Sequence, residues 1–398
     1  MFEFEREPED AFDPNDINFE ADVEVMDQIT KFKWDADLKA VMAEVSPRQV
    51  IFFVKAYYML QLNRTRAKNQ LDRLTEHKDP SHLIDWLFRS SKYLEDQIFL
   101  ALSEYAFNHP VGVWSMCNYG IGPVLTAGLL AYIRMDEKTK TCGQTLRLCG
   151  HNPNDKWLGA VGAEKLLAEI AGRRAATEEA QYVALALRLG RKPEWVREKL
   201  HGKNRVDQVK FLSLRPWNAD FKTLAWKIGQ CLFKFSKRPA CYYGHFYQER
   251  KAYEQAKNGA GDYKGEAERK LRECPTHKQA SIYKRGILSD GHIHSRACKW
   301  AAKQFIIAFW EVLYRYNFPD RQVPVPYVEA HLGHVHMRPP YQLDIYYQAK
   351  ALIDSGKSAR HLVAEAKRKA VGTTEVVDTD DADDVPVEDS GESQEEAS

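Results

Sequence analysis

The stretch YGIGPVLTAGLLAYI, residues 119–133, decides the fold of the middle of the chain. Two glycines flank an isoleucine, and a proline follows at a place that suits the first position of a helix. Apolar segments on both sides give the layout of a helix-hairpin-helix. Glycine permits positive φ and lets a phosphate approach the backbone amides at the helix N-terminus. The residues that would make this contact are Gly120, Ile121, Gly122, Pro123 and Thr126. The alternative is a tight turn between two packed helices.

Helical periodicity covers most of the remaining chain, and strand signals are weak, so the sequence predicts a mostly-α fold with a multi-helix body. Between residues 46 and 74, apolar side chains recur at three- and four-residue steps after Ser46 as cap and Pro47 as first helical residue. Residues 255–291 are polar and contain several glycines, and we expect a loop there.

The expected parts are an acidic disordered tail at 1–28, N-terminal helices at 29–110, the helix-hairpin-helix region at 111–155, an inserted helical hairpin at 156–210, a basic aromatic helical domain at 211–370 and an acidic disordered tail at 371–398.

Charge is segregated along the chain, although the formal net charge is only +1. Residues 1–28 hold 11 acidic residues and one basic residue, and residues 371–398 hold 11 acidic residues and no basic one. Residues 29–370 therefore carry a net charge of +22. A basic body between acidic tails is typical of a polyanion-binding protein whose surface is partly screened by its own tails. The alternative is an ordinary basic protein with solubilising tails.

The seven cysteines are odd in number and form no CxxC pair, which favours reduced thiols over a disulfide framework. The acidic N-terminus has no signal-peptide pattern, and the longest apolar run, residues 124–133, is too short to span a bilayer. We therefore expect a cytoplasmic, nucleoid-associated protein without membrane contact.

Basic residues accompany aromatic ones in two long helical segments, residues 217–237 and 296–316. The aromatic residues have the spacing of a core face, whereas the lysines either face phosphate or form a solvated surface. The inserted hairpin has a helix, a glycine turn and a second helix, which fits either a DNA-reading helix-turn-helix or a plain αα-hairpin. The candidate nucleic-acid contacts in these segments are Arg197, Lys199, Lys222, Lys227, Arg296 and Lys299, and two further candidates, Arg250 and Lys251, lie between the two long segments.

The segment from Gly120 to Ile133 resembles the helix-hairpin-helix of the C-terminal domain of the DEDD-type, bridge-RNA-guided insertion-sequence transposases (the IS-one-ten and IS-one-sixteen types). Weaker similarity extends over about residues 80–316, including Trp217–Lys222, Tyr243–Lys251 and His292–Leu313. The resemblance implies a helical DNA-handling scaffold of mobile-element ancestry.

The chain departs from that family in both parts of its catalytic machinery. Residues 1–110 show no strand-rich nuclease domain with four metal-binding acids. No serine occurs between Ser115 and Ser213, where the family carries its nucleophile. Ser213 is the nearest substitute, but a serine needs a base to become nucleophilic and the sequence shows none beside it. A helix-capping role is the alternative for Ser213.

Histidines gather in two short stretches, and the candidates are His292, His294, His331, His334 and His336. Imidazoles two residues apart can share a metal ion, but the spacing matches no zinc signature. Capping, phosphate contact and core hydrogen bonds are the alternatives. We expect no cofactor, with zinc or magnesium as the alternative.

The sequence thus predicts a transposase-related DNA-binding protein that grips the DNA backbone and lacks strand-transfer activity. A divergent recombinase or metal-dependent nuclease using Ser213 or the histidines is the enzymatic alternative. A protein–protein interaction module is the third. Structured RNA as partner and homo-oligomer formation stay open.

Overall fold

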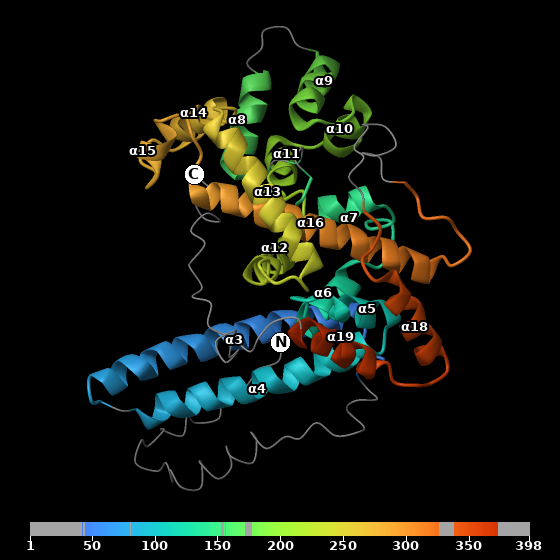
Figure 1. The fold of residues 1–398 in the computed structure, drawn as a ribbon. Helices are drawn as coiled ribbons and strands as arrows, with labels where there is room; N and C mark the ends of the chain where they lie inside the picture. The colour runs from blue at the N-terminus through green and yellow to red at the C-terminus, as the bar shows by residue number, and fades with distance from the viewer. Residues whose placement is uncertain are drawn as a thin grey trace, which may run out of the picture. The chain divides into compact units, whose positions relative to one another are not determined.

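The computed structural model describes residues 42, 44–79, 81–152, 155, 157–171, 177–325 and 338–372. Within these residues it contains sixteen helices and no strand, which confirms the mostly-α prediction (Figure 1). The chain divides into two compact units, residues 1–105 and 106–398. None of the described helices has the length and apolar character that crossing a membrane requires.

The described part of the first unit is formed by α3 (Pro47–Glu76) and by α4 (His82–Phe107) up to residue 105. The α3 helix begins where the sequence predicted, because Ser46 and Gln49 form a reciprocal capping box and Pro47 occupies the first helical position. The guanidinium of Arg64 lies 2.7 Å from the carboxylate of Glu95, which ties the two helices together.

The second unit is organised around α16 (Asp290–Asn317). Fifteen residues of α16 are buried, and residues 305–310 form a continuous buried apolar run, as expected where a helix is enclosed by others. Among the helices packed against α16 are α5 (Pro110–Cys117), α7 (Cys142–Leu148), α12 (Ala219–Lys234) and α13 (Tyr242–Gly259). The hairpin helix α6 (Pro123–Tyr132) packs against α12, where the rings of Tyr132 and Phe221 stack 4.8 Å apart.

Two smaller groups of helices extend this unit. The inserted segment forms α8 (Gly159–Ala171), α9 (Glu178–Leu189), α10 (Pro193–Leu200) and α11 (Arg205–Leu212) around a core of its own. Gly190, with φ +62°, ends α9 in the left-handed conformation that glycine favours. The helices α18 (Leu343–Asp354) and α19 (Arg360–Gly372) pack on α5.

The prediction of a loop at residues 255–291 was wrong. The α13 helix continues to Gly259, and α14 (Lys264–Glu273) and α15 (Ala280–Tyr283) follow. The segment is polar because only one narrow side of it is buried: Ala267 and Leu271 of α14 pack with Tyr283, Leu288 and Ile293. A helix needs few apolar residues when its buried contact is that small.

Close contact between α12 and α16 depends on Gly229. A Cβ atom at this position would lie 2.7 Å from the carbonyl oxygen of Cys298 in α16. Real Cβ atoms do not approach a backbone atom so closely, so any side chain here would force the two helices apart.

We expect Gly229→Ala to destabilise the protein by about 1–3 kcal/mol, because the clash is with backbone and cannot be relieved by a side-chain rotation. Gly143→Ala is the matched control. Gly143 lies in α7 with no atom within 4 Å of the position that a Cβ would take, and alanine is the better helix former by about 1 kcal/mol. Urea unfolding followed by tryptophan fluorescence measures the free energy of unfolding of both variants. Equal stability of the two variants would contradict the close approach.

Candidate nucleic-acid interface

The structure contains the predicted turn, and its two glycines differ in backbone conformation and in the space around them. Gly120 has φ +91°, and a Cβ there would lie 3.3 Å from the ring of Phe235. Gly122 has φ −102° and nothing within 4 Å of its Cβ position. The amide of Ile121 donates to the carbonyl of Asn118 at 3.1 Å, so the expectation of a free amide at Ile121 was wrong. Among the described residues, the amides of Gly120 and Gly122 have no hydrogen-bond partner.

The helices of the hairpin face the interior. Every residue of α5 is buried, as are all residues of α6 after Pro123. Thr126 is fully buried and its hydroxyl lies 2.9 Å from that of Ser115, so it cannot meet a ligand at the surface. Of the predicted contacts in this stretch, only Gly120, Gly122 and Pro123 are partly exposed. Arg238, which the sequence analysis missed, hydrogen-bonds the Tyr119 hydroxyl beside this turn.

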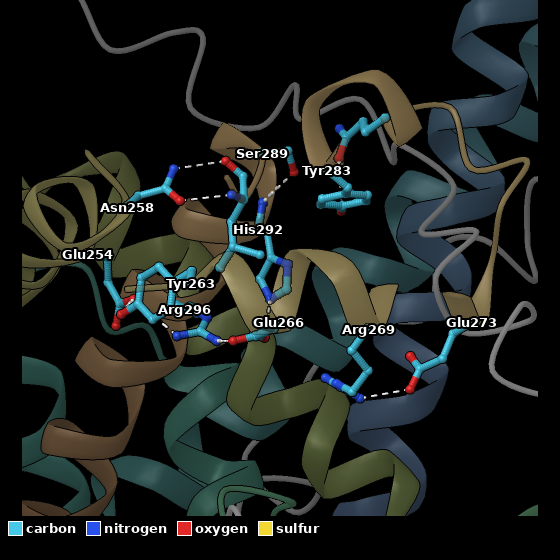
Figure 2. Close-up of polar contacts among 12 residues, drawn as sticks. Glu254, Asn258, Tyr263, Glu266, Arg269, Glu273, Tyr283, Ser289, His292 and Arg296 are labelled. Carbon is cyan, nitrogen blue, oxygen red and sulfur yellow. Dashed lines mark hydrogen bonds and ion pairs between the residues drawn. The ribbon is translucent and has the colours of Figure 1, made fainter. Parts of the chain in front are cut away.

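Arg250 and Arg296 are engaged with a buried carboxylate. Glu254 of α13 has no solvent exposure, and its carboxylate lies 2.5 Å from the guanidinium of Arg250 and 3.2 Å from that of Arg296. Tyr263 donates its hydroxyl to Glu254 at 2.6 Å. Figure 2 shows Arg296 between Glu254 and Glu266, with which it forms a second ion pair. These arginines hold α13, α14 and α16 together, and we leave both out of the candidate interface.

The environment of Glu254 acts on its pKa in two directions. Burial raises the pKa, whereas the hydrogen bond from Tyr263 and the positive charge of Arg250 lower it more. The net result is a pKa below the ordinary value of 4.5. Glu254 is therefore ionised in the folded protein at neutral pH.

The two described histidines of the predicted cluster have separate partners. The imidazole of His292 lies 3.5 Å from the Glu266 carboxylate, as Figure 2 shows. The imidazole of His294 lies 2.9 Å from the Tyr247 hydroxyl and 3.4 Å from the Cys298 thiol. No group of three histidines, cysteines or carboxylates that could hold a metal occurs in the described residues. The other three candidates, His331, His334 and His336, lie outside them.

Ser213 and the predicted contacts of the inserted hairpin have partners within their own helices or next to them. Ser213 ends α11, and its hydroxyl donates to the carbonyl of Lys210 at 2.9 Å, which is the geometry of a helix-end hydroxyl. On the inserted hairpin, Arg197 forms an ion pair with Glu179, and Lys199 lies 2.6 Å from Glu198. These exposed pairs contribute little to stability, and they reduce the net charge that α10 offers to a groove.

Lys222, Lys299 and Lys303 come together where α12 passes α16 and the end of α7. Lys299 and Lys303 are four residues apart, so they lie on one side of α16. Lys222 lies in the first turn of α12, with its ammonium 4.1 Å from the centre of the Trp217 ring. No ion pair with a carboxylate occurs at Lys299 or Lys303 within the described part of the chain. We call these three residues the lysine cluster.

Proximity of the three ammonium groups has electrostatic consequences. The pKa of Lys299 falls below its ordinary value, first through burial and then through the charges of Lys222 and Lys303. Burial also lowers the pKa of Lys303. Burial is the largest cause for both lysines, and at Lys299 the neighbouring ammonium charges add to it.

Aromatic rings lie among these cations. The Trp300 ring has the Lys303 ammonium 5.9 Å and the Arg250 guanidinium 5.0 Å from its centre. Trp226, one turn beyond Lys222 on α12, is 51% exposed. An exposed indole beside positive charge can stack on a base.

Lys227 and Lys251 lie outside the lysine cluster. Burial lowers the pKa of Lys227 on α12. The ammonium of Lys251 on α13 lies 5.8 Å from the Tyr247 ring centre, and its charge contributes to lowering the pKa of His294.

Comparison with family models, with curated proteins and with solved structures found no match to this chain.

We expect Glu254→Gln to destabilise the protein by about 1–3 kcal/mol, because it removes the buried carboxylate that Arg250 and Arg296 share, while both guanidinium groups remain partly exposed to water. The wild-type carboxylate contributes stability above the unfolded pKa of 4.5 and loses it as pH falls through the lower folded pKa. The variant should therefore lose less stability than the wild type on acidification.

Glu273→Gln is the control for this substitution, since the Glu273–Arg269 pair is exposed at both ends and contributes about 0.3–0.5 kcal/mol. Thermal unfolding at pH 7.5 and pH 4 measures both variants. A Glu254→Gln protein as stable as Glu273→Gln would contradict the structural role of this network.

Proposed function

We propose that this chain binds nucleic acid through the sugar-phosphate backbone and that the lysine cluster is its principal contact. The proposal rests mainly on the closeness of Lys299 to Lys222 and Lys303. No carboxylate is paired to Lys299 or Lys303 among the described residues. Holding like charges together costs free energy in the unbound protein. A bound polyanion relieves that repulsion and releases its own counterions.

The wider charge distribution supports a polyanion as partner. Residues 29–370 carry a net charge of +22. Arg250 and Arg296 are paired with Glu254 and Glu266, whereas Lys299 and Lys303 have no ion pair with a carboxylate among the described residues. Lys299 and Lys303 thus offer positive charge that can steer a polyanion.

The exposed Trp226 and the ring of Trp217 under Lys222 favour nucleic acid over other polyanions, because bases stack on aromatic rings.

The proposal includes mobile-element ancestry, as a relative of the transposases that the hairpin resembles. It is supported by the glycine turn with positive φ at Gly120, by Pro123 at the start of α6 and by the unpartnered amides of Gly120 and Gly122. Absence of strand transfer is part of the proposal, supported by the capping geometry of Ser213. No observation favours the enzymatic alternative. A location at the nucleoid would follow from DNA binding.

The first test replaces cluster lysines. We expect Lys299→Gln and Lys303→Gln each to weaken binding of a duplex by about 3–10-fold at 0.1 M salt and to reduce the slope of log K against log salt by about one. Lys357→Gln, at an exposed lysine between α18 and α19, removes the same charge and should change neither value. Fluorescence anisotropy over a salt series measures the affinities. Identical slopes for all four proteins would refute the lysine cluster as the contact.

A second test addresses the hairpin turn separately. We expect Gly122→Val to weaken DNA binding without lowering the melting temperature, because the new side chain meets open space but blocks approach of a phosphate to the amide. Gly120→Val should lower the melting temperature, since φ +91° and the Phe235 ring oppose a side chain there. Unchanged affinity of Gly122→Val would leave the hairpin a packing element only.

A further inference from the structure

A buried histidine lies beside the lysine cluster. His151 is 7% exposed, and its Nδ1 has no hydrogen-bond partner among the described residues. Leaving a buried nitrogen unpaired costs free energy, because the atom has lost its hydrogen bonds to water. An unsatisfied polar atom of this kind calls for an explanation, and a ligand that supplies the missing partner is one.

The backbone fixes His151 at this place. Gly150, with φ +70°, turns the chain after α7, and the amide of His151 donates to the carbonyl of Leu146 at 2.7 Å. The amide of Asn218 donates to the carbonyl of Leu148 at 2.9 Å, which joins this turn to the start of α12. The turn is therefore held by main-chain hydrogen bonds at both of its sides.

Lys222 is part of the same small assembly. A Cβ on Gly150 would lie 3.0 Å from Cδ of Lys222 and 3.4 Å from the Trp217 ring, so the turn rests directly on the lysine stem. Lys299 and Lys303 approach from α16, which packs against α7. Lys222, Lys299 and Lys303, from α12 and α16, are all near enough for their charges to act on the imidazole of His151.

The imidazole is neutral in this environment. Burial first, and then the charges of Lys299, Lys303 and Lys222, lower the pKa of His151 to about 3. A neutral imidazole has one N–H donor and one acceptor nitrogen. It can therefore donate a hydrogen bond to an anion without adding a fourth positive charge.

We propose that His151, Lys222, Lys299 and Lys303 form a binding site for a phosphomonoester, the terminal phosphate of a nucleic-acid strand. This inference rests on the proposed function and specifies what part of the nucleic acid the lysine cluster takes. A terminal phosphate carries nearly two negative charges at neutral pH and has three unesterified oxygens. A phosphodiester carries one negative charge and has only two such oxygens.

The arrangement of the cations favours the monoester over the diester. Proteins that follow the backbone distribute their cations along a groove, one for each successive phosphate. Here Lys222 packs on the turn at Gly150, the charges of all three lysines act on His151 in that turn, and the buried imidazole adds a donor there. A dianion with three free oxygens matches three ammonium groups and one N–H better than a monoanion with two does.

The test measures competition by unlabelled oligonucleotides of one sequence that carry a 5′-phosphate, a 3′-phosphate or only hydroxyl ends. The full-length protein is used, with an internally labelled duplex as reporter. We expect a strand with a terminal phosphate to compete about 10-fold better than the hydroxyl strand. The preference should disappear in Lys303→Gln and in His151→Phe and should persist in Lys357→Gln. Melting temperatures of all variants identify any loss of folding, and Lys303→Gln carries the test if His151→Phe unfolds.

Inorganic phosphate provides the second arm, through its effect on the melting temperature of wild type and Lys303→Gln. Normal duplex binding without any end preference would overturn the terminal-phosphate site and leave the proposed function intact. Stabilisation by inorganic phosphate without end preference would assign the site to a small phosphorylated molecule and overturn the strand-end assignment. Failure to bind every oligonucleotide would overturn the proposed function itself.

Discussion

Contact between α12 and α16 is the constraint on which the candidate interface depends. At Gly229 the two backbones approach so closely that no Cβ fits, and this contact sets where α12 lies along α16. Lys222 at the start of α12 consequently comes within electrostatic range of Lys299, which also lies close to Lys303 on α16. The turn at Gly150 occupies the remaining side of the lysine cluster, held to α12 by the Asn218 amide. The glycine at position 229 thus helps to determine where the charges of the lysine cluster lie.

Arginines and lysines have divided roles on α13 and α16. Arg250 and Arg296 share the buried carboxylate of Glu254, where the planar guanidinium can form several directed hydrogen bonds. The lysine ammoniums, which are compact and strongly hydrated, have no such counter-charge in the described residues at positions 299 and 303. On these helices the arginines therefore hold neighbouring helices together, whereas the lysines supply the positive charge that a ligand can meet. Basic residues read from a sequence do not separate into these two groups by themselves.

Sequence periodicity was sufficient for the helices but not for the interface. The cap at Ser46 and the turn between Gly120 and Pro123 follow from local chemistry, and both were predictable. Lys222 and Lys299 were predicted as contacts from composition alone. Glu254 could not be assigned as the partner of two predicted phosphate ligands, because pairing across helices depends on packing that no local pattern encodes. His151 gave no signal, since its role arises from a tertiary neighbourhood.

The positive charges of the lysine cluster repel one another, and a bound anion would offset this repulsion. Three close cations and an unpaired buried nitrogen destabilise the unbound protein, and hydrophobic burial elsewhere must offset that cost. An anion that binds only the folded state returns stability in proportion to its concentration over its dissociation constant. The free energy of unfolding is then coupled to ligand occupancy. It increases most where nucleic acid is abundant. Replacing a cluster lysine with a neutral residue would relax the unbound protein while removing that gain. The substitution thus raises the stability of the unbound protein and lowers the stabilisation by the anion. On a solvated basic surface both changes would be close to zero, so the pair of measurements distinguishes a binding site from such a surface.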